Sequence, residues 1–79
     1  MRLLRAPAVR ERVALSQSEI TRRRKLGIFP EPVTLGARAV AWLESDIDAW
    51  LAAIVAGADD DAIADLVASQ NAARQGVTS

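Results

Sequence analysis

The side chains that most clearly indicate a chemical role in this chain are four consecutive cations, Arg22 to Lys25, which can bind phosphate groups. The preceding Ser16-Gln17-Ser18-Glu19 is typical of a helix start. The Ser16 hydroxyl can accept the backbone N–H three residues on, and Glu19 can reach back to the Ser16 N–H. Gly27 can end this helix, which places the cations on residues 17–26. Such a helix fits the major groove of DNA, although the same run occurs on solvated faces and in nuclear-localisation signals.

The charges are unevenly distributed along the chain, although the net charge is zero. Residues 1–43 carry nine basic and three acidic side chains, a balance of +6. Residues 44–79 carry one basic and seven acidic side chains, a balance of −6. This segregation indicates a basic surface for a polyanion, joined to an acidic segment with another role.

The composition excludes several kinds of chemistry. Without cysteine there is no disulfide and no thiolate, and without histidine the commonest acid–base group is missing. We therefore expect no enzyme, no cofactor and no metal. With 79 residues, of which 51% are hydrophobic, the chain should form one small folded domain. It holds no long apolar stretch or signal-peptide pattern, so we expect a soluble, cytoplasmic protein without membrane association.

Two short helices are predicted in the basic half. Pro7 suits the first turn of a helix, and apolar residues one turn apart predict a first helix over residues 7–14. Ala14 and Leu15 then form a turn into the helix of the four cations, whose main buried residue should be Ile20. Two helices joined in this way make a helix-turn-helix.

The side of the second helix opposite its buried residue is polar. By the helical period, the outward positions, flanked by Arg23 and Arg24, are Gln17, Ser18, Thr21, Arg22 and Lys25. The full set of candidate DNA contacts, which adds the cap residue and one residue of the following hairpin, is Ser16, Gln17, Ser18, Thr21, Arg22, Arg23, Lys25 and Arg38.

A small β-hairpin should follow the two helices. Residues 29–33 contain two prolines, and each favours extended geometry in the residue before it, which predicts an edge strand or an extended arm. Residues 38–42 predict a second short strand, with the hairpin tip at residues 35–38. A hairpin in this place corresponds to the wing of a winged-helix domain. Arg38 at its tip could reach a phosphate or the minor groove, or could pair with an acid such as Glu44.

The clearest helical pattern lies in the acidic half. Ser45 and the acids beside it suit a helix start, and apolar residues recur at helical spacing over residues 47–55. Trp42 and Trp50 could form a stacking platform for single-stranded nucleic acid. Their spacing favours a place in the core.

Three consecutive acids, Asp59 to Asp61, precede a final helix that we expect to end near Ala73, followed by a frayed tail from Gln75 to Ser79. Such a triplet could bind a metal. It lacks the glycine and the spaced ligands of a calcium loop, which favours helix capping instead.

The apolar face of this final helix consists of Ile63, Leu66 and Val67. Because so small a domain offers little core, we predict an exposed stripe that contacts another protein. The alternative is that the helix packs back on Trp50 and Ile54 and completes the core. The predicted organisation is a DNA-binding domain over residues 1–57 and an oligomerisation or partner segment over residues 58–79.

Several motifs carry a resemblance to one family. In chain order they are Arg5-Ala6-Pro7-Ala8-Val9, Leu15-Ser16-Gln17-Ser18-Glu19-Ile20, Gly27-Ile28-Phe29-Pro30-Glu31-Pro32-Val33-Thr34-Leu35-Gly36-Ala37-Arg38-Ala39-Val40-Ala41-Trp42 and Asp48-Ala49-Trp50-Leu51. Together they resemble the AlpA family, small winged-helix proteins of prophages and integrative elements. These proteins are related to excisionases and more distantly to MerR-type helix-turn-helix proteins. The resemblance covers residues 3–55 without a gap, and FP-x-P and R-A-V-A-W are its most specific parts.

The resemblance implies a mainly α fold with a small β-hairpin, a winged helix-turn-helix plus a C-terminal helix. It also implies sequence-specific binding of double-stranded DNA. Residues 17–26 would lie in the major groove and the hairpin in the adjacent minor groove, with Arg2 and Arg5 near the backbone. The expected location is the bacterial cytoplasm, at the nucleoid when bound to DNA.

Two roles occur in the family. Some members regulate transcription of integrase or neighbouring genes, and others are excisionases that bend attachment-site DNA and assist a tyrosine recombinase. The basic domain with its acidic extension favours an excisionase that self-associates on DNA through the final helix. A protein-interaction adaptor or antitoxin-like module, in which that helix is the working part, is the competing class.

The sequence departs from the family pattern at four positions. Arg23 and Arg24 replace residues that are usually apolar, so these arginines either extend around the core or make the helix more basic. Ala14 replaces the usual turn glycine, which should reduce the stability of the turn. Arg10 replaces an apolar residue of the first helix.

Overall fold

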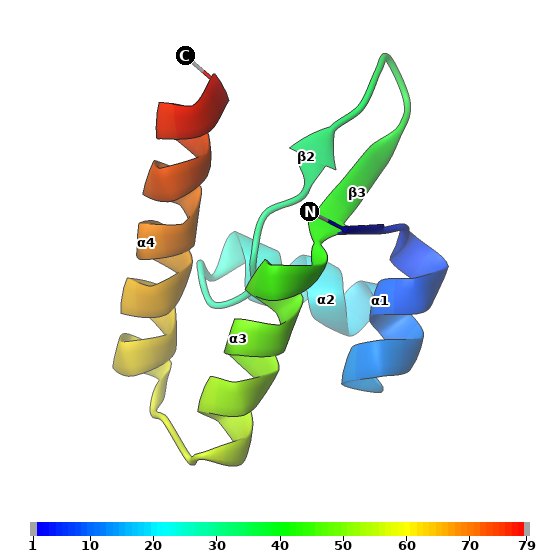
Figure 1. Ribbon diagram of the computed structural model, residues 1–79. Helices are drawn as coiled ribbons and strands as arrows, with labels where there is room; N and C mark the ends of the chain where they lie inside the picture. Colours follow the sequence, from blue (N-terminus) through cyan, green and yellow to red (C-terminus); the bar gives the residue numbers. More distant parts are fainter. Residues whose placement is uncertain (1, 79) are drawn as a thin grey trace.

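The computed structural model describes residues 2–78, and side chains to residue 73. The described chain forms four helices and a small antiparallel sheet, and the hairpin of that sheet projects away from the first three helices (Figure 1). The elements follow the order β1 (Leu3–Leu4), α1 (Ala6–Val13), α2 (Gln17–Lys25), β2 (Val33–Thr34), β3 (Val40–Leu43), α3 (Glu44–Val55) and α4 (Asp60–Thr78). The predicted fold class, a winged helix-turn-helix plus a C-terminal helix, is confirmed.

The helix-turn-helix consists of α1 and α2. Val9 and Val13 of α1 are buried, and Ile20 is the buried residue of α2, as predicted. The turn between the helices depends on Ala14, whose φ of 59° lies in the left-handed region. Because a Cβ makes this conformation unfavourable by roughly 1–2 kcal/mol, the turn is strained in a way that a glycine would relieve.

The wing is the hairpin of β2 and β3, in which Val33 pairs with Ala41 and Thr34 with Val40. A hydrogen bond of 2.7 Å from the Leu35 N–H to the Ala39 carbonyl closes its loop. The sequence did not predict the third strand, β1, which pairs with the other edge of β3 and gives the order β1-β3-β2. β3 leads directly into α3, which begins one residue earlier than the predicted start at Ser45.

Both tryptophans belong to the core, as their spacing predicted. Trp42 and Trp50 are each 2% exposed. The Trp42 indole N–H donates to the Pro30 carbonyl at 2.9 Å, and the Trp50 indole N–H donates to the Ile28 carbonyl at 2.8 Å. These bonds hold the proline-rich segment between α2 and β2 against the core, and Phe29 of that segment meets Trp50 edge to face.

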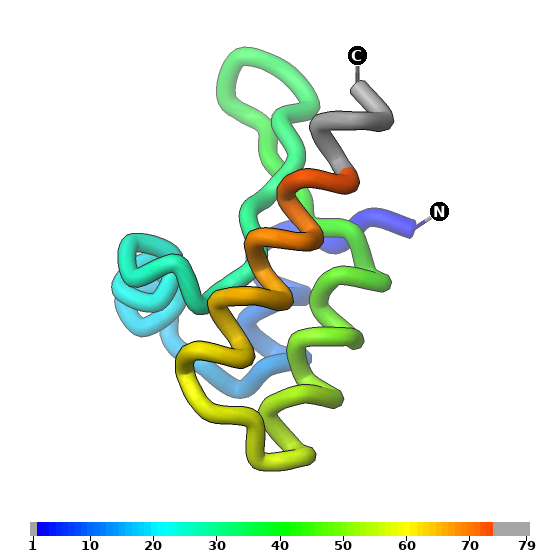
Figure 2. The backbone as a smooth tube through the Cα atoms, turned by 90° about the vertical axis from the view of Figure 1, so that its left-hand side faces the viewer, coloured from blue at the N-terminus to red at the C-terminus, as the bar shows by residue number. Residues whose placement is uncertain are grey.

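The structure overturns the expectation of an exposed stripe on the final helix. Ile63 and Val67 are 2% and 3% exposed and belong to the same buried cluster as the tryptophans, while Leu66 is half-buried. α4 lies beside α3 in both views (Figures 1 and 2), and the Gln70 side-chain amide donates to the Asp46 carbonyl at 3.0 Å. The alternative, a helix that completes the core, is therefore correct. A separate role for residues 58–79 stays a prediction.

The two ends of α4 differ in how well the sequence anticipated them. The Asp59 carboxylate accepts the Ala62 N–H at 2.9 Å, so the capping function of the acidic triplet is confirmed. Among the described residues, no group of three acidic, histidine or cysteine side chains could hold a metal. The helix continues to Thr78, which corrects the expected end near Ala73, and Ser79 lies outside the described residues. No helix within the described chain is long and apolar enough to span a membrane.

Candidate nucleic-acid interface

The first turn of α2 presents three of the candidate contacts. The Ser16 hydroxyl accepts the Glu19 N–H at 3.2 Å and lies 3.3 Å from the Ser18 hydroxyl. Ser16, Gln17 and Ser18 are all exposed. The N-cap thus begins the helix as predicted and leaves three exposed polar side chains at the positive end of the helix dipole, where a phosphate can bind.

The Glu19 carboxylate does not complete the predicted capping box. It binds two cations of its own helix instead: Arg22 through Nη2 at 2.6 Å and Nε at 3.2 Å, and Arg23 through Nε at 2.7 Å. These hydrogen bonds, that of Arg22 first, lower the pKa of Glu19 from 4.5 to about 2. The Arg22 side chain remains 59% exposed, so Glu19 orients this guanidinium without covering it.

Arg23 and Arg24 extend around the core rather than simply outward. The Arg23 guanidinium lies 6.0 Å from the Trp50 ring centre, and the Arg24 guanidinium lies 6.0 Å from that of Trp42. Arg24 also pairs with Glu31 at 2.9 Å. Both side chains are about two-thirds or more buried. The four cations therefore fall into two pairs: Arg23 and Arg24 hold α2 against the core, and Arg22 and Lys25 are exposed.

The wing carries an exposed arginine at the expected place. Arg38 lies in the loop between β2 and β3 and is exposed. The alternative partner considered for it, Glu44, binds Arg12 at 3.1 Å and Arg2 at 3.8 Å. Within residues 2–73, no salt bridge involves Arg38. This guanidinium is therefore available to a partner molecule.

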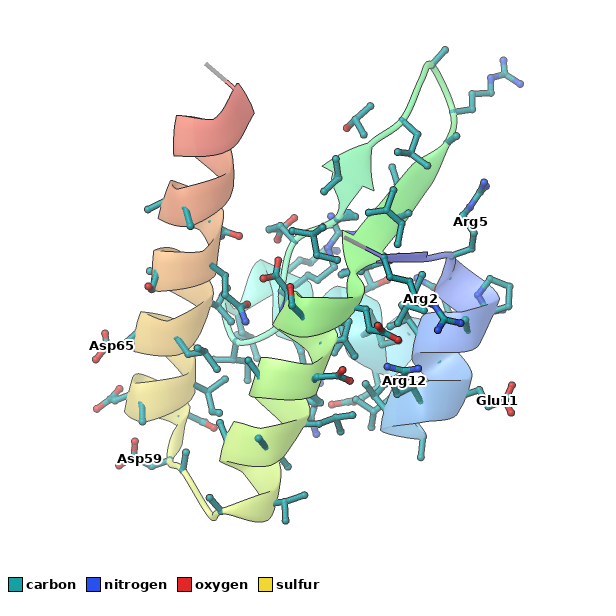
Figure 3. The ribbon with its side chains drawn as sticks, in the orientation of Figure 1. Arg2, Arg5, Glu11, Arg12, Asp59 and Asp65 are labelled. Atoms are coloured by element: carbon teal, nitrogen blue, oxygen red, sulfur yellow. The ribbon has the colours of Figure 1, made fainter. Side chains whose placement is uncertain are left out.

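The remaining arginines of the basic half have different surroundings. Arg12 joins α1 to α3 by binding Asp48 at 2.9 Å as well as Glu44, and these partners raise its pKa. Arg2 is 73% exposed despite its weak pairing with Glu44, and Arg5 points away from the body of α1 (Figure 3). Arg2 and Arg5 can both reach a polyanion, whereas Arg12 is held by two carboxylates.

The segregation of charge along the sequence is also a segregation in space. The labelled acids Asp59 and Asp65 project from α4 on the far side of the molecule from Arg2 and Arg5 (Figure 3). The separation is incomplete, because Glu44 and Asp48 of the acidic half pair with Arg2 and Arg12. At α2, the charge of Asp60 contributes to the raised pKa of Arg22, after the larger effect of Glu19. The acidic start of α4 therefore lies within electrostatic reach of the exposed end of α2.

One polar contact of α2 escaped the sequence analysis. The Arg10 guanidinium of α1 donates through Nη1 to Gln17 Oε1 at 3.0 Å, and Gln17 Nε2 lies 3.3 Å from Thr21 Oγ1. Arg10 stands where the family pattern has an apolar residue, which was the available signal. The contact brings an α1 side chain to the candidate face of α2.

The eight candidate contacts thus differ in how exposed they are and in whether other residues of the chain bind them. Six are exposed on α2, its cap or the wing: Ser16, Gln17, Ser18, Arg22, Lys25 and Arg38. Thr21 is half-buried on the same face, and Arg23 is engaged by Glu19 and Trp50. The assignment of all eight to DNA stays a prediction, and the geometry supports it least for Arg23.

Comparison with known proteins identifies the family to which the chain belongs. The model of the family described as "Prophage CP4-57 regulatory protein (AlpA)" matches residues 2–55. A relative from Enterobacteria phage P4, described as "Uncharacterized protein ORF88", is 45% identical over 56 residues. That match covers 71% of this chain and 64% of the relative. No solved structure matches the chain.

Proposed function

Because the chain belongs to the AlpA family of prophage regulatory proteins, we propose that it is a sequence-specific double-stranded DNA-binding regulator of a mobile element. The observation that carries this proposal is the exposed polar face of α2, which shares the basic half of the chain with the exposed Arg38 of the wing. In the proposed mechanism α2 enters the major groove and the wing enters the adjacent minor groove. Arg2 and Arg5 neutralise phosphates beside them.

The proposed activity needs no catalytic chemistry from this chain. Phosphate contacts supply affinity, and polar side chains at the start of α2 read base edges. The protein would act in the bacterial cytoplasm, at the nucleoid when bound to DNA. The adaptor or antitoxin-like hypothesis depended on an exposed apolar stripe on α4, and the burial of Ile63 and Val67 removes that support.

A second candidate role is that of an excisionase which assists a tyrosine recombinase. Its basis in the sequence is the basic domain with its acidic, amphipathic extension, and the burial of Ile63 and Val67 means that self-association on DNA needs another surface. Ile54 and Val55 offer one, since they are 37% and 85% exposed at the end of α3. This end lies opposite the wing (Figures 1 and 2), so contact through it would leave the wing free.

A footprinting experiment on the DNA beside the protein's own gene tests both roles. Protection of a promoter supports transcriptional regulation. Protection of adjacent repeats within an attachment site, together with stimulation of excision by the recombinase, supports the excisionase. Absence of any protected sequence, with no salt-dependent retention of duplex DNA, would contradict the DNA-binding proposal itself.

A further inference from the structure

Three polar side chains form a chain of hydrogen bonds across the helix-turn-helix. Arg10 Nη1 of α1 lies 3.0 Å from Gln17 Oε1, and Gln17 Nε2 lies 3.3 Å from Thr21 Oγ1. Gln17 itself is exposed in the first turn of α2, whereas Arg10 and Thr21 are half-buried on either side of it. The glutamine is thus exposed to a partner molecule and held from both sides.

The chemistry of this chain fixes which way the Gln17 amide points. A guanidinium has only donors, so the group facing Arg10 must be the amide oxygen, and the NH₂ group must face Thr21. Each end of the amide is only partly used. Oε1 keeps one lone pair and Nε2 keeps one N–H, so Gln17 presents one acceptor and one donor side by side.

That pair of groups complements one base in the major groove. Adenine offers the N6 amino donor and the N7 acceptor at neighbouring positions, and a glutamine amide binds both. Guanine offers two acceptors there, thymine one acceptor and cytosine one donor, so each of these bases leaves a group of the amide unmatched. We propose that Gln17 reads an adenine and that Arg10 is the positioning residue that orients its amide, an inference that rests on the DNA-binding function proposed above.

Arg10 contributes to recognition by fixing the orientation of the Gln17 amide before the protein binds DNA. A free glutamine side chain must lose rotamer freedom when it meets a base, and either orientation of its amide is available in water. The bond to Arg10 removes the wrong orientation in advance. This role differs from that of a phosphate contact, which would strengthen binding to every sequence equally.

The test is selection of sites from a random duplex DNA library, followed by sequencing. The wild-type protein should prefer adenine at one position by roughly 5- to 150-fold. Gln17→Ala should abolish that preference and leave the other positions unchanged. Arg10→Met, which keeps an unbranched stem of similar length, should weaken the preference at that position several-fold. Added to Gln17→Ala, it should have no further effect there.

Two further variants keep the test independent of folding defects. Gln17→Glu retains the bond to Arg10 but replaces the donor by an acceptor, and should move the preferred base from adenine to cytosine. Arg12→Met is the matched control, because Arg12 lies on the same helix but binds Glu44 and Asp48. It should leave every base preference unchanged. Thermal unfolding of each variant separates loss of fold from loss of specificity.

Defined outcomes would overturn the inference. An adenine preference that survives Gln17→Ala, or the absence of any adenine preference in a wild-type protein that selects other bases, excludes reading by Gln17. An even loss of affinity at all sequences in Arg10→Met, with a smaller salt dependence, makes Arg10 a phosphate contact. If the wild-type protein binds no duplex DNA at low salt and therefore selects no sequence, the proposed function as a whole is contradicted.

Discussion

α2 and α4 both carry a strongly charged surface, but the molecule holds them in different ways. α2 fully buries only Ile20, and its own Arg23 and Arg24 hold it to the core by lying over Trp50 and Trp42. α4 is held by its own face, through Ile63, Val67 and Gln70 against α3 and the core. The difference indicates that α2 is free to present side chains to a partner, whereas α4 supports the fold.

The comparison predicts the largest effect at the face of α4. Ile63→Ala should reduce the free energy of unfolding by about 2–5 kcal/mol, because it removes apolar contacts from the core and leaves a cavity. Chemical denaturation monitored by tryptophan fluorescence measures this change. The matched control is Asp65→Ala on the exposed side of the same helix, with an expected change of roughly 0.5 kcal/mol or less. Wild-type stability in Ile63→Ala would restore the view of α4 as a free interaction segment.

A smaller effect, on binding rather than on stability, is expected at α2. Arg22→Ala should weaken binding to the specific site by about 1–3 kcal/mol and affect random DNA much less, as loss of a base contact does. Arg23→Ala is its matched partner, since both arginines bind Glu19 but Arg23 lies over Trp50. We expect Arg23→Ala to lower the unfolding midpoint clearly while changing the DNA affinity little. Fluorescence anisotropy with both DNAs measures the binding, and equal losses for Arg22→Ala on the two DNAs would reduce that residue to a phosphate contact.

The turn that aligns α2 gives a third prediction, of opposite sign. Ala14→Gly should raise the free energy of unfolding by about 0.5–1 kcal/mol, because glycine adopts the positive φ without a Cβ clash. Part of the gain is offset by the greater freedom of glycine in the unfolded chain. The same denaturation experiment measures it, and a destabilised variant would show that the alanine methyl group makes contacts more valuable than the strain it causes.

The smallest predicted effect is the pH dependence contributed by Glu19. Its pKa is about 2 in the folded protein, below the ordinary 4.5, so the carboxylate stabilises the fold above pH 4.5 and this contribution is lost as the pH falls towards 2. Glu19→Gln removes the titrating group. The difference in unfolding midpoint between wild type and variant should therefore shrink over that pH range, and a difference that stays constant would exclude the ion pairs with Arg22 and Arg23 as its cause.

The sequence predicted those elements whose signals are local. The cap at Ser16 and the helical period of α3 lie within a few residues of what they determine, and both helices formed close to the predicted bounds. The prolines after α2 predicted an extended segment over residues 29–33, but the strand β2 is only Val33–Thr34 and overlaps that range by one residue. β1 was missed because two leucines make no periodic pattern. Their strand exists only through pairing with β3, about forty residues later in the chain.

The errors at the candidate site have the same physical origin. The docking of α4 depends on contacts between residues far apart in the sequence, such as Gln70 with Asp46 and the burial of Ile63 and Val67 in the common core, which no spacing rule reveals. The division of the four cations depends on where Trp42 and Trp50 come to lie beneath Arg24 and Arg23. Arg10 stood out as a departure from the family pattern, but its partner Gln17 became evident only in the fold.

The central claim, that α2 and the wing meet DNA while α4 supports the fold, can be tested by one titration. Amide chemical shifts of isotope-labelled protein would be followed by NMR as a duplex containing the footprinted site is added. The account predicts the largest changes at Gln17, Ser18, Arg22, Lys25 and Arg38, with the amides of α4 from Ile63 to Gln70 nearly unchanged. Changes concentrated on α4, with α2 and the wing unaffected, would contradict it.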